Sequence, residues 1–254
     1  MSGRLTVVGL GPGQAELMTP AASAALASAT DLIGYGPYLE RIAAAPAGQR
    51  RHASENRVEL DRARHALELA ASGQSVAVVS GGDPGVFAMA AAVFEAIETG
   101  PVQWRALDIR VEPGVTAMLA AAAEIGAPLG GDFCAISLSD NLKSWVTITR
   151  RLEAACAGDF VIALYNPSSK ARPHQLGEAF AILGRHKPPS TIVVMVRAAG
   201  SGEMRRITTT LGEVDPARAD MRTLVLIGSS ATRLIARAGG DSWVYTPRRE
   251  ELAP

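Results

Sequence analysis

Short runs of apolar, often β-branched residues recur along the chain, and each run leads through small residues into a helical pattern. Such runs, bounded by turn residues, are typical of strands buried inside a sheet. The clearest of them cover residues 6–8, 76–80, 109–111, 160–164, 191–196 and 224–227. Strands that alternate with helices favour an α/β fold whose sheets are mostly parallel and covered by helices on both faces.

The most regular helical pattern predicts a helix over residues 57–72. Asn56 stands at its N-cap position, Glu59 follows three residues later, and Gly73 supplies a stop. The buried face of this helix is expected to consist of Ala63, Leu67 and Ala70.

Two further helices are expected to begin at Thr19-Pro20 and at Arg172-Pro173, because proline suits the first turn of a helix. An alanine-rich helix over residues 115–125 follows a break at Pro113-Gly114. We therefore predict two α/β domains, residues 1–113 and residues 114–254, with a cleft between them.

The composition favours a small-molecule substrate. The chain has 254 residues, 48% of them hydrophobic, and its 25 basic and 25 acidic residues give zero net charge. A protein that binds the nucleic-acid backbone normally carries a basic excess. Nearly all the basic residues are arginines, which suit bidentate recognition of carboxylates, although a compositional bias of the genome would produce the same skew.

Neither a metal site nor a membrane segment is predicted. Cys134, Cys156 and the four histidines have no ligand-like spacing. The chain opens on a strand pattern rather than on a signal peptide, and no apolar run approaches the roughly 20 residues that span a bilayer. We therefore expect a cytoplasmic protein.

Gly9-Leu-Gly11-Pro-Gly13 follows the first predicted strand. A dinucleotide-binding loop would need its third glycine where Gln14 stands, and a P-loop would need a Gly-Lys-Ser/Thr sequence that is absent here. Pro12 also lacks the backbone donor that an anion nest uses. This loop is either part of a different ligand site or simply a tight turn.

Three more segments stand where a strand meets a helix or a loop: Gly81-Gly-Asp-Pro-Gly85, Pro113-Gly-Val-Thr-Ala117 and Leu164-Tyr-Asn-Pro-Ser168. Ligands of open α/β sheets bind beyond the carboxyl ends of the strands. Asp83 could accept hydrogen bonds from a ribose or an ammonium group, or it could cap the helix that follows. Four such segments favour a ligand site.

Together, the four segments resemble the tetrapyrrole methylase family, the class III S-adenosylmethionine methyltransferases. The order and spacing of Val7–Gly13, Gly81–Gly85, Pro113–Ala117 and Leu164–Pro167 match that family, and the similarity extends to about Arg248. The resemblance implies two αβα domains, a cofactor bound in the cleft between them, and a homodimer.

Position by position, the resemblance implies which residues contact S-adenosylmethionine or its product S-adenosylhomocysteine. They are Pro12, Gly81, Gly82, Asp83, Val86, Thr116, Ala117, Tyr165, Asn166 and Ala199. Members that methylate uroporphyrinogen carry an acid where Gly36 stands and a methionine where Asn166 stands. The two departures argue against that substrate.

Residues 34–38, 132–140 and 165–168 resemble one branch of the family. That branch methylates C17 of precorrin-3B and contracts the ring to precorrin-4 in cobalamin biosynthesis. The enzyme of the oxygen-independent pathway methylates the same carbon of cobalt-factor III and has overlapping motifs. The sequence does not separate this alternative from the first. By the same resemblance, a base would take a proton from the C20 hydroxyl, and the candidates are Asp140, Asp83 and Tyr35.

A tetrapyrrole has many acetate and propionate arms, which arginines could bind. The candidates are Arg150, Arg172 and Arg197, which are nearest to the motifs. The alternative role of Asp140 is that of an N-terminal cap, before Trp145, for the helix that follows. Three other functions stay open: an NAD-dependent reductase that uses Gly9–Gly13, a carrier of unstable tetrapyrroles, and modification of ribosomal RNA, which the neutral charge disfavours.

Overall fold

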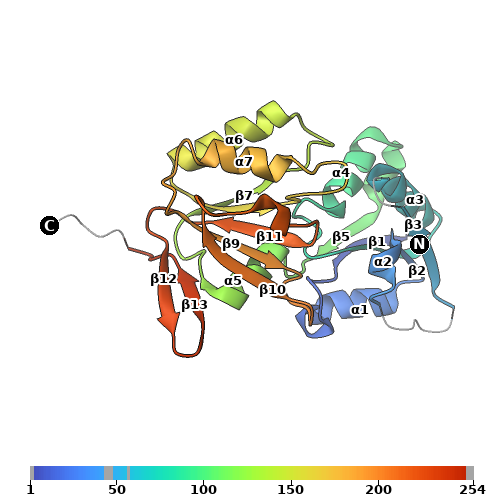
Figure 1. The fold of residues 1–254 in the computed structure, drawn as a ribbon. Coiled ribbons are helices and arrows are strands. Elements are labelled where there is room, and N and C mark those ends of the chain that lie inside the picture. The colour runs from blue at the N-terminus through green and yellow to red at the C-terminus, as the bar shows by residue number, and fades with distance from the viewer. Residues whose placement is uncertain (1–2, 43–47, 56–57, 250–254) are drawn as a thin grey trace. The chain divides into compact units, whose positions relative to one another are not determined.

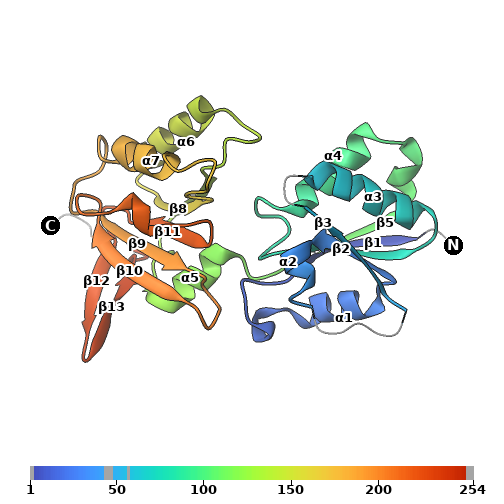
Figure 2. The same ribbon diagram turned by 45° about the vertical axis from the view of Figure 1, so that its right-hand side comes forward.

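The structure is a computed structural model that describes residues 3–42, 48–55 and 58–249. The chain divides between Ala117 and Met118 into two compact units (Figures 1 and 2). The boundary expected after residue 113 falls just before this division. All six predicted strands are present, so the α/β class is confirmed.

The first unit contains a five-stranded sheet with the order β3-β2-β4-β1-β5, and all of its described pairings are parallel. Its strands are β1 (Arg4–Gly9), β2 (Asp31–Tyr35), β3 (Arg50–Ser54), β4 (Ser75–Ser80) and β5 (Asp108–Glu112). Val7 and Val78 face α3 (Glu59–Ala71) and α4 (Met89–Thr99). Their sequence neighbours point to the opposite face, because side chains alternate along a strand.

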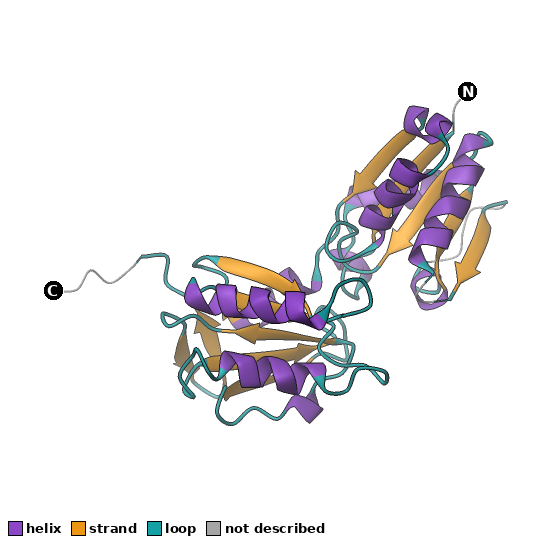
Figure 3. Ribbon diagram, turned by 90° about the horizontal axis from the view of Figure 1, so that it is seen from above, coloured by secondary structure: helices purple, strands orange, loops and turns teal. Residues whose placement is uncertain are grey.

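On that opposite face, Val8 and Val79 pack towards α1 (Pro20–Ser28) and α2 (Gly36–Leu39). The unit is therefore a three-layer αβα sandwich, with helices on both sides of the strands (Figure 3). The described part of this unit also contains the 3₁₀ helices η1 (Ala15–Leu17) and η2 (Val102–Ala106).

The helix starts of this unit were predicted in part. Thr19 caps α1 by accepting a hydrogen bond from the Ala22 amide, and Pro20 is the first helical residue, as expected. Ala63, Leu67 and Ala70 are buried on α3, also as expected. The predicted cap Asn56 and first residue Arg57 lie outside the described residues. In the described part α3 begins at Glu59, after Val58, whose side chain forms no capping hydrogen bond.

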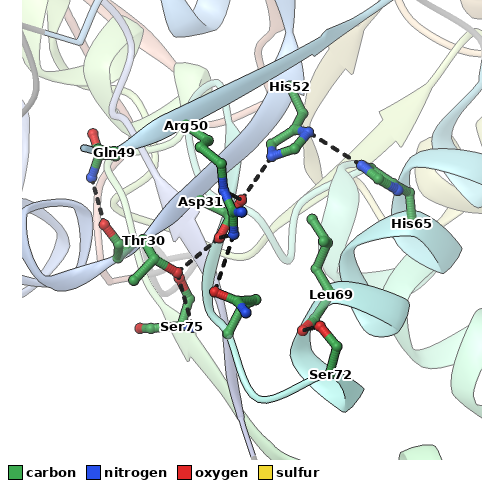
Figure 4. A network of polar contacts seen from close by, with 11 residues as sticks. Thr30, Asp31, Gln49, Arg50, His52, His65, Leu69, Ser72 and Ser75 are labelled. Atoms are coloured by element: carbon green, nitrogen blue, oxygen red, sulfur yellow. Dashed lines mark hydrogen bonds and ion pairs between the residues drawn. The ribbon is translucent and has the colours of Figure 1, made fainter.

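A polar side-chain network, rather than an apolar run, reinforces the backbone pairing of the outer strand β3 with β2 (Figure 4). Asp31 is fully buried and accepts hydrogen bonds of 2.8 Å from Arg50 Nε and Arg50 Nη2, and from Thr30 Oγ1. His52 Nε2 lies 2.8 Å from Asp31 Oδ1, and His52 Nδ1 lies 3.3 Å from His65 Nε2. Burial alone would raise the pKa of Asp31, but the hydrogen bonds from Arg50, His52 and Thr30 outweigh it and lower the pKa to about 2.

The sheet of the second unit has the order β10-β9-β11-β8-β7. Its strands are β7 (Phe133–Ser137), β8 (Val161–Tyr165), β9 (Ile192–Arg197), β10 (Arg205–Thr210) and β11 (Thr223–Ile227). Among the described pairings of this sheet, only that of β7 with β8 is parallel. The expectation of mostly parallel strands is therefore wrong here. The loop between β9 and β10 is too short to hold a crossover helix, so β10 returns antiparallel.

The core of this unit lies between one face of the sheet and the adjacent helices α6 (Trp145–Ala157) and α7 (Gln175–Leu183), while α5 (Ala117–Ile125) lies on the other face (Figure 1). The remaining elements are η3 (Pro216–Arg218) and a small sheet of β6 (Gly126–Ala127), β12 (Arg233–Arg237) and β13 (Gly240–Tyr245).

One predicted helix start is wrong, and the alternative role of Asp140 as a cap is excluded. Helix α7 begins at Gln175 and not at Arg172-Pro173, because Ser169 and Arg172 exchange backbone hydrogen bonds of 3.2 and 3.0 Å that hold the preceding segment in a turn. Helix α6 is capped by Ser144, which accepts a hydrogen bond from the Thr147 amide, so Asp140 is not its cap.

Candidate functional site

The carboxyl ends of β1 and β4 are joined through their glycine loops. The Gly11 amide donates to the Gly82 carbonyl over 3.1 Å, and the Gly82 amide donates back to the Gly11 carbonyl over 2.9 Å. Both residues have positive φ, 69° and 67° respectively, a conformation that glycine adopts without strain. The Gly9–Gly13 loop is thus part of a larger arrangement and not an isolated turn.

A third glycine segment packs against these two. A Cβ on Gly9 would lie 2.7 Å from the Gly114 nitrogen, and a Cβ on Gly114 would lie 2.3 Å from the Gly82 carbonyl oxygen. Glycine is therefore needed at Gly9 and Gly114 because backbone meets backbone. The sequence motif suggested an approach to a ligand, whereas the structure shows that the loops also approach one another.

Asp83 fixes this arrangement. Its Oδ1 accepts a hydrogen bond of 2.8 Å from the Gly85 amide, and its Oδ2 accepts one of 3.1 Å from the Gly114 amide. Asp83 does not cap the next helix, since the N-cap of α4 is Ala88. Contact of Asp83 with a cofactor and its service as a base stay predictions.

The remaining cofactor candidates of the first unit surround the same point. Pro12 lies between Gly11 and Gly13, and Val86 closes the second loop. A Cβ on Gly82 would lie 3.7 Å from the Cα of Thr116, which is buried, and 3.9 Å from the Ala117 nitrogen. The structure therefore brings together the candidates from three separate segments.

The sequence motifs did not indicate Tyr38 and Arg41, each of which contacts one of the two glycine loops. A Cβ on Gly81 would meet the Tyr38 ring at 2.7 Å, and burial raises the pKa of the Tyr38 phenol. Arg41 Nη2 donates to the carbonyls of Leu10 and Gly11 over 3.2 and 3.0 Å. The Gly34–Tyr38 stretch was the available signal, but only Tyr35 was chosen from it. Tyr35 packs edge-to-face on Tyr38, with ring centroids 5.5 Å apart.

In the second unit, the candidates gather at the carboxyl end of β8. The Tyr165 hydroxyl accepts a hydrogen bond of 3.1 Å from the Met118 amide at the start of α5. Asn166 Nδ2 donates to Ser137 Oγ at the end of β7, over 2.9 Å. These contacts fix the loop after β8 to its neighbours.

Arg172 supports the same loop from inside the protein. Only 7% of its surface is exposed, and its Nη1 donates to the Asn166 carbonyl over 3.3 Å. Arg172 Nε lies 3.9 Å from Asp140 Oδ1, too far for a hydrogen bond, and Gln175 Nε2 donates to Asp140 Oδ2 over 3.4 Å. In its present contacts, Arg172 positions Asn166 and Asp140.

Several buried polar atoms of Arg172 and of residues that contact Arg172 or Asp140 have no hydrogen-bond partner among the described residues. They are Arg172 Nε, Ser169 Oγ and Gln175 Oε1. Because an unsatisfied buried polar atom costs about 1–3 kcal/mol, such a group indicates a place that water or a ligand completes.

Backbone strain also concentrates at the candidate loops. The described non-glycine residues with positive φ are Phe87 (52°), Asn166 (53°), Ala198 (50°) and Asp159 (49°). The first three stand in or next to segments with predicted cofactor contacts: Phe87 follows Val86, and Ala198 precedes Ala199. Strained backbone of this kind clusters at ligand sites.

The other two arginine candidates differ from Arg172. Arg197, at the end of β9, donates to Asp220 Oδ2 over 2.8 Å. Arg150 is exposed on α6 and has no ion-pair partner in the described part of the chain. Contact of Arg150, Arg172 or Arg197 with a substrate stays a prediction.

Within the described ranges, His, Cys, Asp and Glu nowhere form a group of three that could hold a metal ion. No helix in the same ranges combines the length and the apolar character needed to cross a membrane.

Comparison with known proteins agrees with the geometry. Residues 4–215 match the family described as tetrapyrrole (corrin/porphyrin) methylases. A precorrin-3B C(17)-methyltransferase from Sinorhizobium sp is 59% identical over 98% of this chain and 97% of its own length. A probable cobalt-factor III C(17)-methyltransferase from Salmonella typhimurium is 38% identical over 96% of this chain and 98% of its own.

Among solved structures, that of the methyltransferase CobJ superposes with a TM-score of 0.91 and 53% identity, over 97% of this chain and 100% of the other. The predicted fold, two units of α/β structure, is thus shared with a structure of high sequence identity. The match to the family covers well over half of the chain and includes the interlocked glycine loops and the end of β8. The chain therefore belongs to the tetrapyrrole (corrin/porphyrin) methylases.

Proposed function

We propose that this protein methylates C17 of precorrin-3B, with contraction of the macrocycle to precorrin-4, as a step of cobalamin biosynthesis. The observation that carries the proposal is the 59% identity to the Sinorhizobium precorrin-3B C(17)-methyltransferase. This similarity covers nearly the whole of both chains and not the glycine loops alone. It therefore supports a shared substrate as well as a shared fold.

S-adenosylmethionine is the methyl donor in this proposal. In the first unit, the residues that would hold it are Pro12, Gly81, Gly82, Asp83, Val86, Thr116 and Ala117, and in the second they are Tyr165, Asn166 and Ala199. The strained backbone at Phe87, Asn166 and Ala198 supports this assignment, because these loops pay a conformational cost that a bound ligand would justify. The donor supplies a sulfonium methyl whose C–S bond breaks as the new carbon–carbon bond forms, leaving the electron pair on sulfur.

Because a sulfonium methyl is already activated, the protein needs no nucleophile of its own. Its task is to hold C17 in line with the methyl and to exclude water, and such positioning contributes about 7–11 kcal/mol. The rigid contacts among Gly11, Gly82 and Gly114 suit that task.

Ring contraction additionally removes a proton from the C20 hydroxyl. We assign Asp140 as the favoured base, because its carboxylate is about one-third exposed and lies beside the buried Arg172 and the unsatisfied polar atoms. Asp83 is less suited, because both of its oxygens accept backbone hydrogen bonds. Tyr35 is the third candidate. A well-placed base contributes about 10²–10⁴-fold in rate.

Acetate and propionate arms of the substrate would bind arginines, and Arg150 and Arg197 are the more exposed of the three candidates. We also propose a homodimer that works in the cytoplasm, as the family resemblance implies. Light scattering of the protein as it elutes from a size-exclusion column measures the molar mass, and we expect that of a dimer.

The second candidate is methylation of C17 of cobalt-factor III. The 38% identity to the Salmonella relative favours it over any other reaction, though less than the first. The two differ in whether the macrocycle carries cobalt.

One experiment tests both. Purified protein is incubated with methyl-labelled S-adenosylmethionine and either precorrin-3B or cobalt-factor III, and the products are analysed by mass spectrometry. We expect one labelled methyl on C17 and a contracted ring from precorrin-3B, with little product from the cobalt compound. Turnover of the cobalt compound alone would reverse the assignment, and labelling of neither would contradict both.

A further inference from the structure

A pocket of about 220 Å³ opens on the second unit, over strands β9, β10 and β11 and beside η3. Its lining consists of Met195, Arg197, Arg205, Ile207, Arg218 and Thr223. Half of these residues are arginines, a concentration of positive charge in a protein whose net charge is zero.

Nearby acids do not fully neutralise the positive charges of the three arginines that line this arginine pocket. Arg197 and Arg205 are directly opposite one another on antiparallel strands, an arrangement in which like charges destabilise a sheet. Arg197 pairs with Asp220 over 2.8 Å and lies 3.9 Å from Glu203. Glu203 in turn pairs with Arg222 over 2.6 Å.

The two nearby acids are thus engaged by Arg197 and Arg222. Among the residues that the structure describes, Arg205 and Arg218 have neither an ion-pair partner nor a side-chain hydrogen bond. Arg205 acts on Glu203 only at longer range, as one of the charges that lower the pKa of that carboxyl. Two arginines at one pocket, neither held in a close ion pair within the described ranges, are suited to an anion that comes from outside.

The floor of the pocket is apolar. Met195 is buried, and Ile207 packs against the core of the unit. An apolar wall beside guanidinium groups lowers the local dielectric and strengthens their attraction for an anion. The volume lies below the roughly 300–1,000 Å³ of sites that hold a whole small molecule. The pocket therefore suits a short carboxylate arm and not an entire macrocycle.

The surroundings connect the pocket to the candidate site. Arg197 immediately precedes Ala198 and Ala199, the strained segment after β9. Arg172 Nη2 lies 3.8 Å from the sulfur of Met221, the residue after Asp220. A ligand group that contacts Arg197 would thus lie next to the segment that carries Ala199, and Arg172 links the segment around Met221 to the Asn166 loop.

We propose that this pocket binds one acetate or propionate arm of the tetrapyrrole, with Arg205 and Arg218 as its direct donors. Asp220 holds Arg197 at the rim. This assignment rests on the proposed function, which supplies the polycarboxylate substrate. It adds two residues, Arg205 and Arg218, that the sequence motifs did not indicate.

The test compares wild type with Arg205→Gln and Arg218→Gln. Arg64→Gln is the matched control, since Arg64 is an exposed arginine of the first unit whose nearest acid, Asp61, is 3.7 Å away. The probes are cobyrinic acid, a stable corrin polycarboxylate, its heptamethyl ester, which lacks the negative charges, and free succinate. Affinities are measured by calorimetry at low salt, and thermal unfolding verifies that each variant is folded.

We expect each pocket variant to bind cobyrinic acid about ten-fold more weakly than wild type, the size of one charged hydrogen bond. Arg64→Gln and wild type should bind it equally, and the ester should bind all four proteins alike. Equal affinity of all four proteins for cobyrinic acid, or no binding by wild type, would overturn the proposal. Arginine-dependent binding of succinate but not of cobyrinic acid would also overturn it and would indicate a site for a free small anion.

The methyl-transfer assay on the same proteins separates the two levels of inference. Transfer by wild type without any dependence of cobyrinic acid affinity on Arg205 or Arg218 would remove the pocket assignment and leave the proposed function. Binding of cobyrinic acid that depends on Arg205 or Arg218, without methyl transfer to either precursor, would remove the proposed function and leave the pocket assignment.

Discussion

The Oδ2 atom of Asp83 accepts a hydrogen bond of 3.1 Å from the backbone amide of Gly114, which is 31 positions away in the sequence. Its other oxygen accepts from Gly85, so one carboxylate holds the loop after β4 closed and attaches it to the segment after β5. The relative position of two segments with predicted cofactor contacts therefore depends in part on a single side chain, in addition to the close backbone packing of Gly82 and Gly114.

Asp83→Asn should weaken both the fold and cofactor binding. The asparagine amide presents an NH₂ group to one of the two backbone donors, which leaves that donor unsatisfied at a cost of about 1–3 kcal/mol. We expect a loss of that size in urea unfolding and at least about ten-fold weaker binding of S-adenosylhomocysteine by calorimetry. Asp61→Asn, on the exposed surface of α3, is the control. Unchanged cofactor affinity in a destabilised Asp83→Asn protein would show that the loops are structural only.

The glycines of the interlocked loops should differ in their tolerance of a methyl group. Gly9→Ala places Cβ 2.7 Å from the Gly114 nitrogen, and we expect a loss of about 2–3 kcal/mol, because the contact is with backbone that cannot move aside. Gly82→Ala meets nothing nearer than 3.7 Å but retains a positive φ of 67°, so we expect only about 1–2 kcal/mol. Valine at Gly82, a β-branched residue, would be strained further and is the poorer probe.

Gly36→Ala is the matched control, since a Cβ on Gly36 has no atom within 4 Å in the described structure. Its stability should equal that of wild type or slightly exceed it, because Gly36 begins α2. Urea unfolding of the three variants gives the order directly. A Gly9→Ala protein as stable as Gly36→Ala would contradict the close approach of the loops.

Much of this arrangement could be predicted from the sequence, because the strands in question are apolar runs that end in glycine motifs. β3 could not, since Arg50–Ser54 has no apolar pattern and is held by the buried carboxylate of Asp31. The strand β10 and the antiparallel direction of β9 and β11 were also missed, since an apolar run does not encode the direction of its neighbour. Tyr38 and Arg41 contact the glycine loops through the folded chain, and no local spacing reports such contacts.

Asp31 should make the stability of the protein sensitive to acid. Its pKa is lowered from 3.8 to about 2 in the folded state, so folding favours the ionised carboxylate. The resulting stabilisation, about 2.5 kcal/mol, is present in full above about pH 4 and is lost as the pH falls towards 2. Urea unfolding measured between pH 5 and pH 2 tests this.

The comparison for that experiment is Asp31→Asn, which cannot ionise. The variant should be less stable than wild type at pH 7, because Arg50 and His52 lose their anionic partner, and the difference between the two proteins should shrink below about pH 4. A difference that stays constant from pH 7 to pH 2 would mean that the carboxylate contributes nothing through its charge.

Asp140 offers the sharpest separation of methyl transfer from ring contraction. The carboxylate lies beyond the end of β7, within reach of Gln175 and near the buried guanidinium of Arg172. Asp140→Asn keeps the size of the side chain and an oxygen that can accept from Gln175, but it removes the base. If Asp140 takes the C20 hydroxyl proton, formation of the contracted product should slow by about 10²–10⁴-fold. The affinity for S-adenosylhomocysteine should be unchanged.

Quenched-flow sampling with mass spectrometry follows the methylated and the contracted species separately, so the two rates are measured in one reaction. Asp132→Asn is the control, since Asp132 is an exposed acid at the other end of the same strand. A base should also produce a pH-dependent contraction rate in wild type that is absent from the variant. If Asp140→Asn contracts the ring at the wild-type rate, the proton goes to Tyr35, Asp83 or a carboxylate of the substrate. The contact with Gln175 would then be the whole role of Asp140, because Ser144 already caps the helix that follows.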